Sequence, residues 1–218
     1  MSRAPLYELR GYGGGEPAPA LDLARLHAQL LGHSPVPRLG PDFASGFYYS
    51  VLPAQDHNFG AVAYVDGFPA GFVCATASSG DFLIKAARQN LFRVAYLVAK
   101  SVGRKPARIR DIAATLYRMY KRANMPQAES EILSLGVLPE YGGRFARQTG
   151  IRISNDLIDL AVEGCRRRGA RSVRVSVDGR NLPAQLLYSS LGWNLEDTNV
   201  FDTSGDIVEF SLPLRHAA

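Results

Sequence analysis

The chain has 218 residues, of which 46% are apolar, and a formal net charge of +5. This length and apolar content suffice for one sizeable hydrophobic core, so we expect a single domain over residues 1–218. No stretch reaches the roughly 18 uncharged apolar residues of a membrane span, and residues 1–9 lack the pattern of a signal peptide. We therefore expect a cytoplasmic protein without a membrane span.

The cysteines and histidines do not form the pattern of a disulfide framework or of a metal site. Cys74 and Cys165 are far apart, each in an apolar stretch, and we expect both to be buried free thiols. No two histidines have the helical i, i+4 spacing that would direct two ring nitrogens at one metal ion. We therefore expect no metal cofactor.

The first third of the chain contains two helical patterns followed by a hairpin pattern. Leucines recur at spacings of about 3.6 residues over 19–31, which predicts an amphipathic helix. A second helix is expected over 42–52, where it would start directly after a proline. Two strands, 60–65 and 70–77, flank an Asp66-Gly67 turn and predict a hairpin.

The region from about 81 to 122 is helical and basic in pattern. Its apolar residues recur on one face of each expected helix, so these helices should pack against the rest of the domain. We interpret the region as an insertion that covers a sheet. A lid over the acceptor site and a helix lying on a membrane surface are the alternatives.

The second half of the chain predicts a strand-helix-strand unit. A strand over 130–137 is followed by a long helix over about 148–168, and Gly169 closes that helix in a position that suits a left-handed residue. Valines alternate over 173–177 as in a half-buried strand, so the two strands should be parallel, with a right-handed crossover. A short helix over 183–191 and strands over 193–201 and 207–212 complete the expected elements.

One short motif lies between the first of these strands and the long helix. It consists of Arg147, Gln148, Thr149, Gly150, Ile151 and Arg152. At a helix start, backbone N–H groups without partners and the helix dipole favour an anion, and the glycine lets the backbone approach it closely. The motif is consistent with a diphosphate site and, taken alone, equally with a simple helix start.

Three segments together resemble the GNAT superfamily of N-acetyltransferases. Residues 147–152 resemble its Arg/Gln-x-x-Gly-x-Gly/Ala signature, and residues 135–141 are similar to its Val-x-Pro-x-Tyr approach. A third segment is similar to Asn-x-x-Ala-x-x-x-Tyr-x-x-x-Gly-Phe, with Trp in place of Phe, and its matching residues are Asn181, Ala184, Tyr188, Gly192 and Trp193. The resemblance also covers a strand over about 6–11 and the two helices and hairpin that follow it.

The resemblance implies an α/β fold and a co-substrate. The fold would be a mixed, mostly antiparallel sheet with a central parallel strand pair, helices on both faces and a helical insertion between the third and fourth strands. The co-substrate would be acetyl-CoA, whose phosphates would account for the positive charge without a nucleic acid. The chain departs from the family where residues 142–146 lengthen the approach to the loop, and where Arg152 replaces the customary Gly or Ala.

The resemblance also implies roles for single residues. The strand end from Leu135 to Val137 would separate from its parallel neighbour, so that pantetheine pairs with it and a backbone N–H polarises the thioester carbonyl. Tyr188 would protonate the leaving thiolate, unless it is simply a core tyrosine. Asn181 would bind the cofactor backbone or, equally, cap the helix that follows it.

Two carboxylates are candidates for the base that removes a proton from an amine. Glu129 and Glu131 stand two residues apart on the fourth strand and so face the same side of the sheet. Each could instead be a salt-bridged surface group. Neither cysteine lies in a motif that would support an acyl-enzyme, so direct attack in a ternary complex is preferred.

The sequence thus predicts an acetyl-CoA-dependent N-acetyltransferase acting on a primary amine of a small molecule, with a homodimer as a possible assembly. An acyltransferase using a longer acyl-CoA or an acyl-carrier protein is the alternative, with the apolar residues of 82–98 housing the chain. A non-catalytic CoA-binding sensor and a nucleic-acid-binding module, the latter using the basic stretches at 104–110 and 166–168, also remain open.

Overall fold

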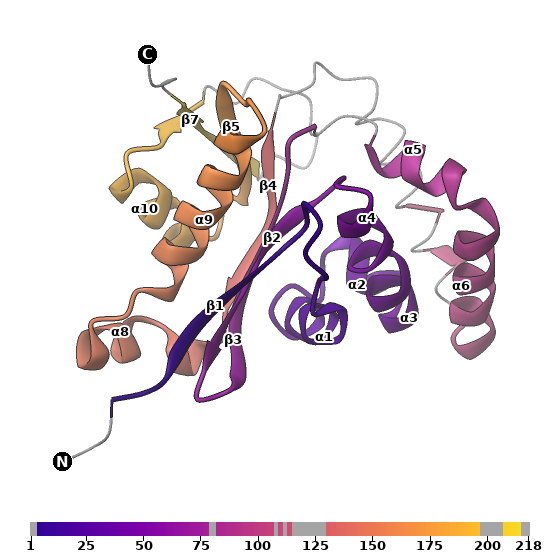
Figure 1. The fold of residues 1–218 in the computed structure, drawn as a ribbon, viewed down its shortest axis with the longest axis horizontal. Helices are drawn as coiled ribbons and strands as arrows, with labels where there is room; N and C mark the ends of the chain where they lie inside the picture. The colour runs from indigo at the N-terminus through magenta and orange to yellow at the C-terminus, as the bar shows by residue number, and fades with distance from the viewer. Residues whose placement is uncertain are drawn as a thin grey trace.

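The computed structural model describes residues 4–78, 82–106, 109–110, 113–114, 130–196 and 207–214. They form a seven-stranded sheet with helices on both faces (Figure 1). The strand order is β1-β2-β3-β4-β5-β7-β6. Among the described helices, none is long and apolar enough to cross a membrane.

The first four strands form the antiparallel part of the sheet. They are β1 (Tyr7–Tyr12), β2 (Phe59–Val65), β3 (Phe68–Thr76) and β4 (Glu131–Val137), each paired antiparallel with the next. Asp66 and Gly67 have φ of 51° and 81°, both in the left-handed region, and turn β2 into β3. The predicted hairpin is confirmed.

The other strands follow a parallel step. β5 (Ser172–Asp178) pairs parallel with β4, and β7 (Ile207–Pro213) pairs antiparallel with β5. β6 (Asn194–Leu195) pairs with β7 at the edge of the sheet. The predicted mixed, mostly antiparallel sheet with one central parallel pair is confirmed.

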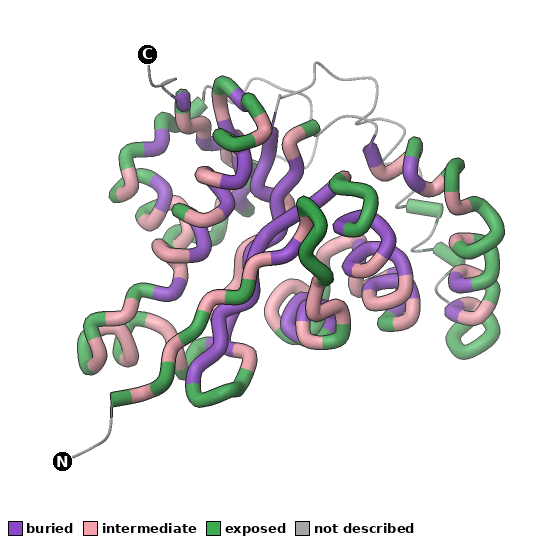
Figure 2. The backbone as a smooth tube through the Cα atoms, in the orientation of Figure 1, coloured by how far each residue is buried: buried purple, intermediate pink, exposed green. Residues whose placement is uncertain are grey.

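One face of the sheet is covered by α9 (Ile153–Arg167), with α10 (Leu182–Ser190) beside it. Figure 2 shows α9 buried along the side that faces the strands. The apolar side of α9 packs on β2, β3 and β4, and Gly169 ends the helix region with φ of 78°. The long helix is shorter than predicted, because residues 143–149 form a separate helix, α8 (Gly143–Thr149), after the short turn η2 (Pro139–Tyr141).

The opposite face is covered by α1 (Ala20–Leu30) and by four short helices: α2 (Pro35–Arg38), α3 (Pro41–Phe43), η1 (Ala44–Tyr48) and α4 (Val51–Ala54). The prediction of one helix over 42–52 was wrong, because η1 is a π-helix and a break follows it. Phe47, Tyr48 and Tyr49 are all buried.

The predicted insertion begins with α5 (Phe82–Gln89) and α6 (Leu91–Arg104). α6 packs against α3 and η1, one layer out from the sheet. The prediction that the insertion covers a sheet was therefore wrong for α6, which covers other helices. Most of residues 107–129 lie outside the described part of the chain.

Candidate functional site

A gap opens in the centre of the sheet between β4 and β5. The two strands pair only at Glu131 with Arg174 and at Ile132 with Val175, although β5 continues to Asp178. On the other side, β4 remains paired with β3 up to Val137. The far half of β4, which includes Leu135 and Val137, therefore has one side of its backbone free of strand pairing in the described structure.

An irregularity in β4 marks the point where the gap begins. Cys74 of β3 pairs with Ser134 and Ala75 pairs with Ile132, so Leu133 is an extra residue on β4. An extra residue of this kind bends the strand and increases its local twist. The bulge thus directs the second half of β4 away from β5.

The motif 147–152 lies near the end of this gap, but not as predicted. Arg147, Gln148 and Thr149 finish α8, and Gly150, with φ of 79°, ends it in the left-handed conformation. Ile151 links the two helices, and Arg152 holds the N-cap position of α9. The prediction that the motif opens the long helix holds only for its last residues, because α8 and its glycine cap occupy the rest.

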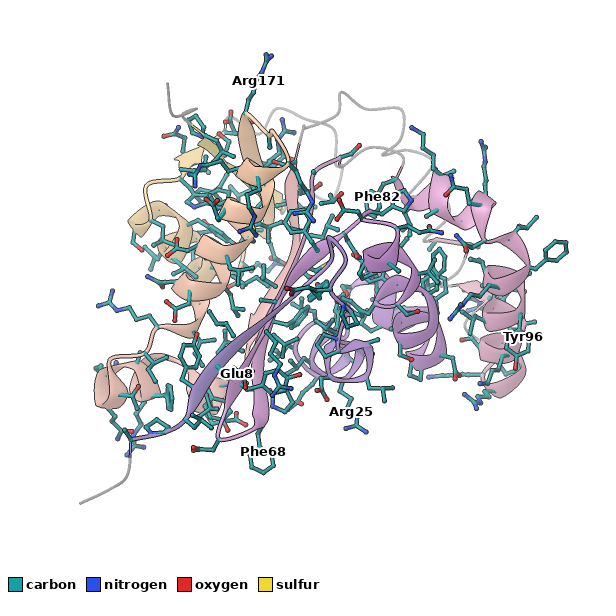
Figure 3. All side chains as sticks on the ribbon, viewed as in Figure 1. Glu8, Arg25, Phe68, Phe82, Tyr96 and Arg171 are labelled. Atoms are coloured by element: carbon teal, nitrogen blue, oxygen red, sulfur yellow. The ribbon has the colours of Figure 1, made fainter. Side chains whose placement is uncertain are left out.

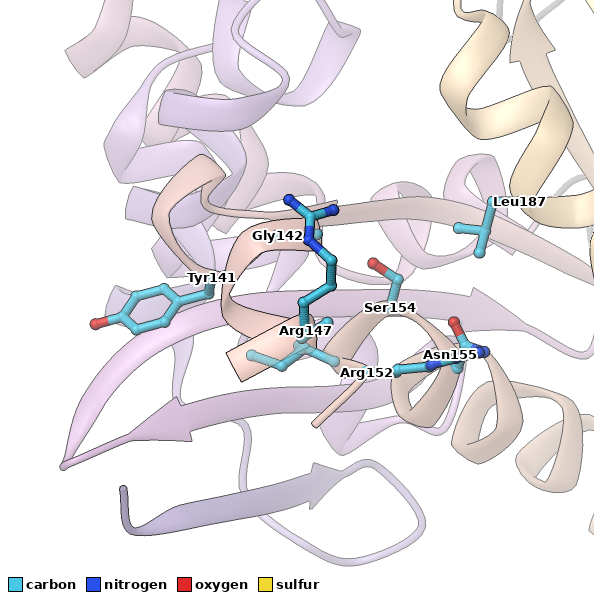
Figure 4. A pocket seen from close by; sticks show the side chains of 10 residues that line it. Tyr141, Gly142, Arg147, Arg152, Ser154, Asn155 and Leu187 are labelled. Carbon is cyan, nitrogen blue, oxygen red and sulfur yellow. The ribbon is translucent and has the colours of Figure 1, made fainter. Parts of the chain in front are cut away.

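A pocket of about 350 Å³ lies at the N-terminus of α9 (Figure 4). Arg147 reaches across it from α8, Ser154 points toward it from the first turn of α9, and Leu187 closes it from α10. The full lining is Tyr141, Gly142, Gly143, Ala146, Arg147, Arg152, Ile153, Ser154, Asn155 and Leu187. The first N–H groups of α9 have no partner within the helix, and two arginines line the same space, so the pocket suits an anion.

The motif located this pocket but only in part its lining. Arg147 and Arg152 line it, whereas Gln148, Thr149, Gly150 and Ile151 do not. The Thr149 hydroxyl instead donates to the Phe145 carbonyl (2.9 Å). The Gly142-Gly143 pair and Asn155 were missed, and the signal that could have found them is the lengthened segment 142–146 itself.

Comparison with known proteins gives structural matches only. No family model matches the sequence, and no curated protein does. A GNAT-family acetyltransferase structure from Desulfovibrio desulfuricans matches with a TM-score of 0.55 at 14% identity, over 95% of this chain and 99% of the other. An agmatine N-acetyltransferase matches with a TM-score of 0.53 at 17% identity, over 96% and 100%.

A third structure, Arabidopsis thaliana Naa50, was solved with a bisubstrate analogue that contains CoA. It matches with a TM-score of 0.52 at 14% identity, over 95% of this chain and 99% of the other. The chain has the GNAT fold. At sequence identities of 14% to 17%, these matches establish the fold alone.

Within this GNAT fold, Tyr188 lies on α10, one residue after the pocket-lining Leu187. Its side chain is buried and packs against Trp193 (5.1 Å between ring centroids) and Phe210 (5.9 Å). Burial raises the pKa of the Tyr188 phenol well above its usual value. The phenol is therefore protonated at any physiological pH, and the residue is also part of the core.

Asn181 occupies the N-cap position of α10. Its side-chain oxygen accepts a hydrogen bond from the Ala184 backbone N–H (3.2 Å). Of the two predicted roles, helix capping is the one that the structure shows.

Glu131 lies at the start of β4, one residue before the last pairing with β5, and is buried. It is close to Tyr48 of η1, on the face opposite α9: burial chiefly raises the pKa of Tyr48, with smaller contributions from Cys74, Tyr49 and Glu131. Glu131 is thus a buried carboxylate rather than a surface group. Glu129 lies outside the described residues.

Both thiols are buried, as predicted. Burial raises the pKa of Cys74 to about 11 and that of Cys165 to about 11. Thiolate, the nucleophilic form, is therefore scarce at neutral pH at both positions. Among the described residues, no group of His, Cys, Asp or Glu side chains is arranged to hold a metal ion.

Proposed function

We propose that this protein transfers the acetyl group of acetyl-CoA to a primary amine of a small molecule, by direct attack in a ternary complex. The observation that carries the proposal is the gap between β4 and β5, with an anion-binding pocket at its end. A single extended thioester could occupy both, with its pantetheine arm along β4 and its diphosphate at the N-terminus of α9. The shared fold supports the same activity.

The pocket suits the diphosphate of acetyl-CoA in charge and geometry. Arg147 and Arg152 supply two positive charges, and the start of α9 supplies N–H donors and the positive end of the helix dipole. The Ser154 side chain, which points toward the pocket, adds a hydroxyl donor. The free side of β4 would pair with the amides of the pantetheine arm as a neighbouring strand would.

The reaction needs three groups from this chain. A backbone N–H of the segment Leu135–Val137 would stabilise the oxyanion that forms when the amine nitrogen attacks the thioester carbonyl carbon. Glu131 would accept the proton that the attacking nitrogen loses, directly or through water. As the C–S bond breaks, Tyr188 would give its proton to the thiolate.

The acceptor would approach from the face of the sheet that α1 to α4 cover. Glu131 lies on that face beside Tyr48, whereas α9 and the pocket lie on the other. A buried carboxylate attracts a cationic amine and can then deprotonate it, so a primary amine is the acceptor that this arrangement favours.

Titration calorimetry with acetyl-CoA tests the proposal directly. The variant Gly150→Trp places a bulky side chain beside the pocket, at a position with open space around the glycine. Gly169→Trp is its matched control, because Gly169 is also left-handed and unobstructed but lies at the other end of α9. We expect saturable binding to the wild type and to Gly169→Trp, and at least about a tenfold loss of affinity in Gly150→Trp, or roughly 1.4 kcal/mol.

Two outcomes would count against the proposal. An absence of binding to the folded wild type would remove acetyl-CoA as the substrate. Turnover that strongly prefers a long-chain acyl-CoA over acetyl-CoA would favour the longer-chain acyltransferase instead.

A further inference from the structure

Helix α6 is apolar on two sides, and only one of them faces the protein. The inner side, which includes Val94, Leu97 and Ser101, packs against α3 and η1, and the Ser101 hydroxyl donates to the Leu39 carbonyl (2.6 Å). The outer side is exposed and consists of Leu91, Phe92, Ala95, Tyr96, Ala99 and Gly103. We call this second set the outer face of α6.

The exposure of the outer face is large for such side chains. Phe92 is 91% exposed, Tyr96 64% and Leu91 61%. These three side chains lie within two adjacent turns of α6, so they form a single apolar patch. Figure 3 shows Tyr96 pointing outward from the last layer of the molecule.

The charges carried by residues 82–106, which include the outer face, all have one sign. Residues 82–106 contain no Asp or Glu. Their cationic residues are Lys85, Arg88, Arg93, Lys100, Arg104 and Lys105. The α5–α6 pair is therefore a cationic surface around an apolar, aromatic patch.

Some of these cations hold α6 in place. Lys100 and Arg104 both form ion pairs with Asp42 of α3, and Lys100 Nζ lies 3.0 Å from Asp42 Oδ1. The Arg93 side chain donates a hydrogen bond to the Gly46 carbonyl (3.0 Å). Arg88 in the last turn of α5 and Lys105 directly after α6 are exposed, and neither forms an ion pair with another described residue. The patch thus has an exposed cation near each end.

We propose that the outer face of α6 binds an anionic lipid bilayer. Phe92, Tyr96 and Leu91 would enter the boundary between headgroups and acyl chains, with α6 parallel to the surface, and Arg88 and Lys105 would meet anionic headgroups. The outer face belongs to the outermost helix, on the far side of the molecule from α9 and its pocket (Figure 1). Lipid binding there would leave the pocket open.

Charge complementarity favours a bilayer over a second copy of the chain. A contact between two copies through this face would bring the same cations together, with no Asp or Glu in residues 82–106 to pair with them. A bilayer containing anionic lipid supplies both the apolar interior and the negative charge that the outer face requires.

Co-sedimentation of the full chain with phosphatidylcholine vesicles, with and without phosphatidylserine, tests this proposal. We expect binding that requires phosphatidylserine and weakens with added salt. Phe92→Ser with Tyr96→Ser should reduce the partition coefficient by at least about tenfold. The matched control is Phe68→Ser, because Phe68 is 68% exposed but lies in the β2–β3 hairpin, away from α6.

A second pair of variants tests the charge. Arg88→Glu with Lys105→Glu should lower binding to phosphatidylserine vesicles by at least about tenfold. Arg25→Glu, at an exposed position of α1, should not lower it. Unchanged secondary structure by circular dichroism would establish that each variant is folded. An absence of vesicle binding by the wild type, or equal binding by Phe92→Ser with Tyr96→Ser, would overturn the proposal. A dimer that this double variant dissociates, without lipid binding, would assign the face to a second copy.

Discussion

Among single residues, the buried histidine of α1 links the stability of the fold to pH. Both ring nitrogens of His27 lie within hydrogen-bond distance of a hydroxyl. Nδ1 is 2.6 Å from the Tyr49 hydroxyl, and Nε2 is 2.7 Å from the Ser34 hydroxyl. Burial lowers the pKa of His27 to about 4, from 6.5. The neutral ring can donate at one nitrogen and accept at the other, which satisfies both contacts.

We expect the free energy of unfolding to fall as the pH decreases from about 6.5 to about 4. Over this range the unfolded chain binds a proton at residue 27 and the folded chain does not, so His27 alone contributes a loss of about 3 kcal/mol. Urea unfolding at a series of pH values would measure this loss in the free energy of unfolding. His27→Gln should flatten this dependence, whereas His33→Gln, on an exposed residue, should not. Equal slopes in the wild type and His27→Gln would contradict the assignment.

Tyr188 has two roles to separate, packing in the core and the proposed proton donation, and they differ by a single oxygen atom. Tyr188→Phe keeps the packing against Trp193 and Phe210 and removes the proton donor. We expect turnover to fall by about 10²-fold or more while the affinity for acetyl-CoA is unchanged. Tyr96→Phe, on exposed α6, is the control. Full turnover by Tyr188→Phe would leave the residue a core tyrosine only.

Glu131 can be tested by its pH profile. Glu131→Gln keeps the size of the side chain and removes the base, so kcat/KM should fall by about 10²-fold or more and its rise with pH should be lost. The exposed Glu140→Gln should leave the profile unchanged. A profile that keeps its shape in Glu131→Gln would assign proton removal to another group.

At the level of elements, the strands, the left-handed turns and the short helix α10 could be predicted, whereas α8 and the distortion at η1 could not. Alternating valines and the Asp66-Gly67 pair determine strands and a turn through local preferences that the sequence displays. α8 begins at a glycine pair, which disfavours a helix, and Phe145 packs on Tyr141 (5.4 Å). η1 depends on the burial of aromatic residues against α1 and the sheet. Contacts of this kind are absent from any local pattern.

The candidate site also has one part that the sequence predicts and another part that depends on distant contacts. The position of a pocket at the start of α9 could be predicted, because a helix start with a glycine and arginines is a local feature. The exact lining could not, because α8 places Gly142 and Gly143 at the pocket in place of Gln148 and Thr149. The bulge at Leu133 depends on pairing with β3, a partner more than fifty residues earlier in the sequence.

Two helical glycines give opposite predictions for the same substitution. A Cβ at Gly164 of α9 would lie 2.4 Å from the Phe59 ring, which Arg168 covers at 3.9 Å, so the ring cannot easily move. Gly164→Ala should therefore destabilise the fold by about 1–3 kcal/mol, despite the better helix propensity of alanine. Gly103→Ala meets no atom within 4 Å and should stabilise by about 0.5–1 kcal/mol. Urea unfolding of both variants would check this pair, and a stabilised Gly164→Ala would contradict the close packing of α9 on β2.

For the whole molecule, the sheet separates the pocket at the start of α9 from the buried carboxylate Glu131. The pocket lies with α8, α9 and α10 on one side, and Glu131 faces α1 to α4 on the other. In the proposed reaction, acetyl-CoA and the amine would approach from opposite sides of the sheet and would be bound at the same time. A covalent acyl-enzyme would instead need a reactive nucleophile at the gap, and burial keeps both thiols protonated.

We therefore expect initial-rate plots that intersect when acetyl-CoA and the amine are varied together, as for a ternary complex. A Cys74→Ala, Cys165→Ala double variant should keep kcat within about threefold of the wild type, because direct attack as proposed uses neither buried thiol. Each substitution removes a buried sulfur, so the free energy of unfolding is measured alongside and should fall by about 1–2 kcal/mol per site. Parallel initial-rate plots, together with an acetyl group bound to the protein in a mass spectrum, would require a nucleophile on the chain and would replace direct attack by a two-step transfer.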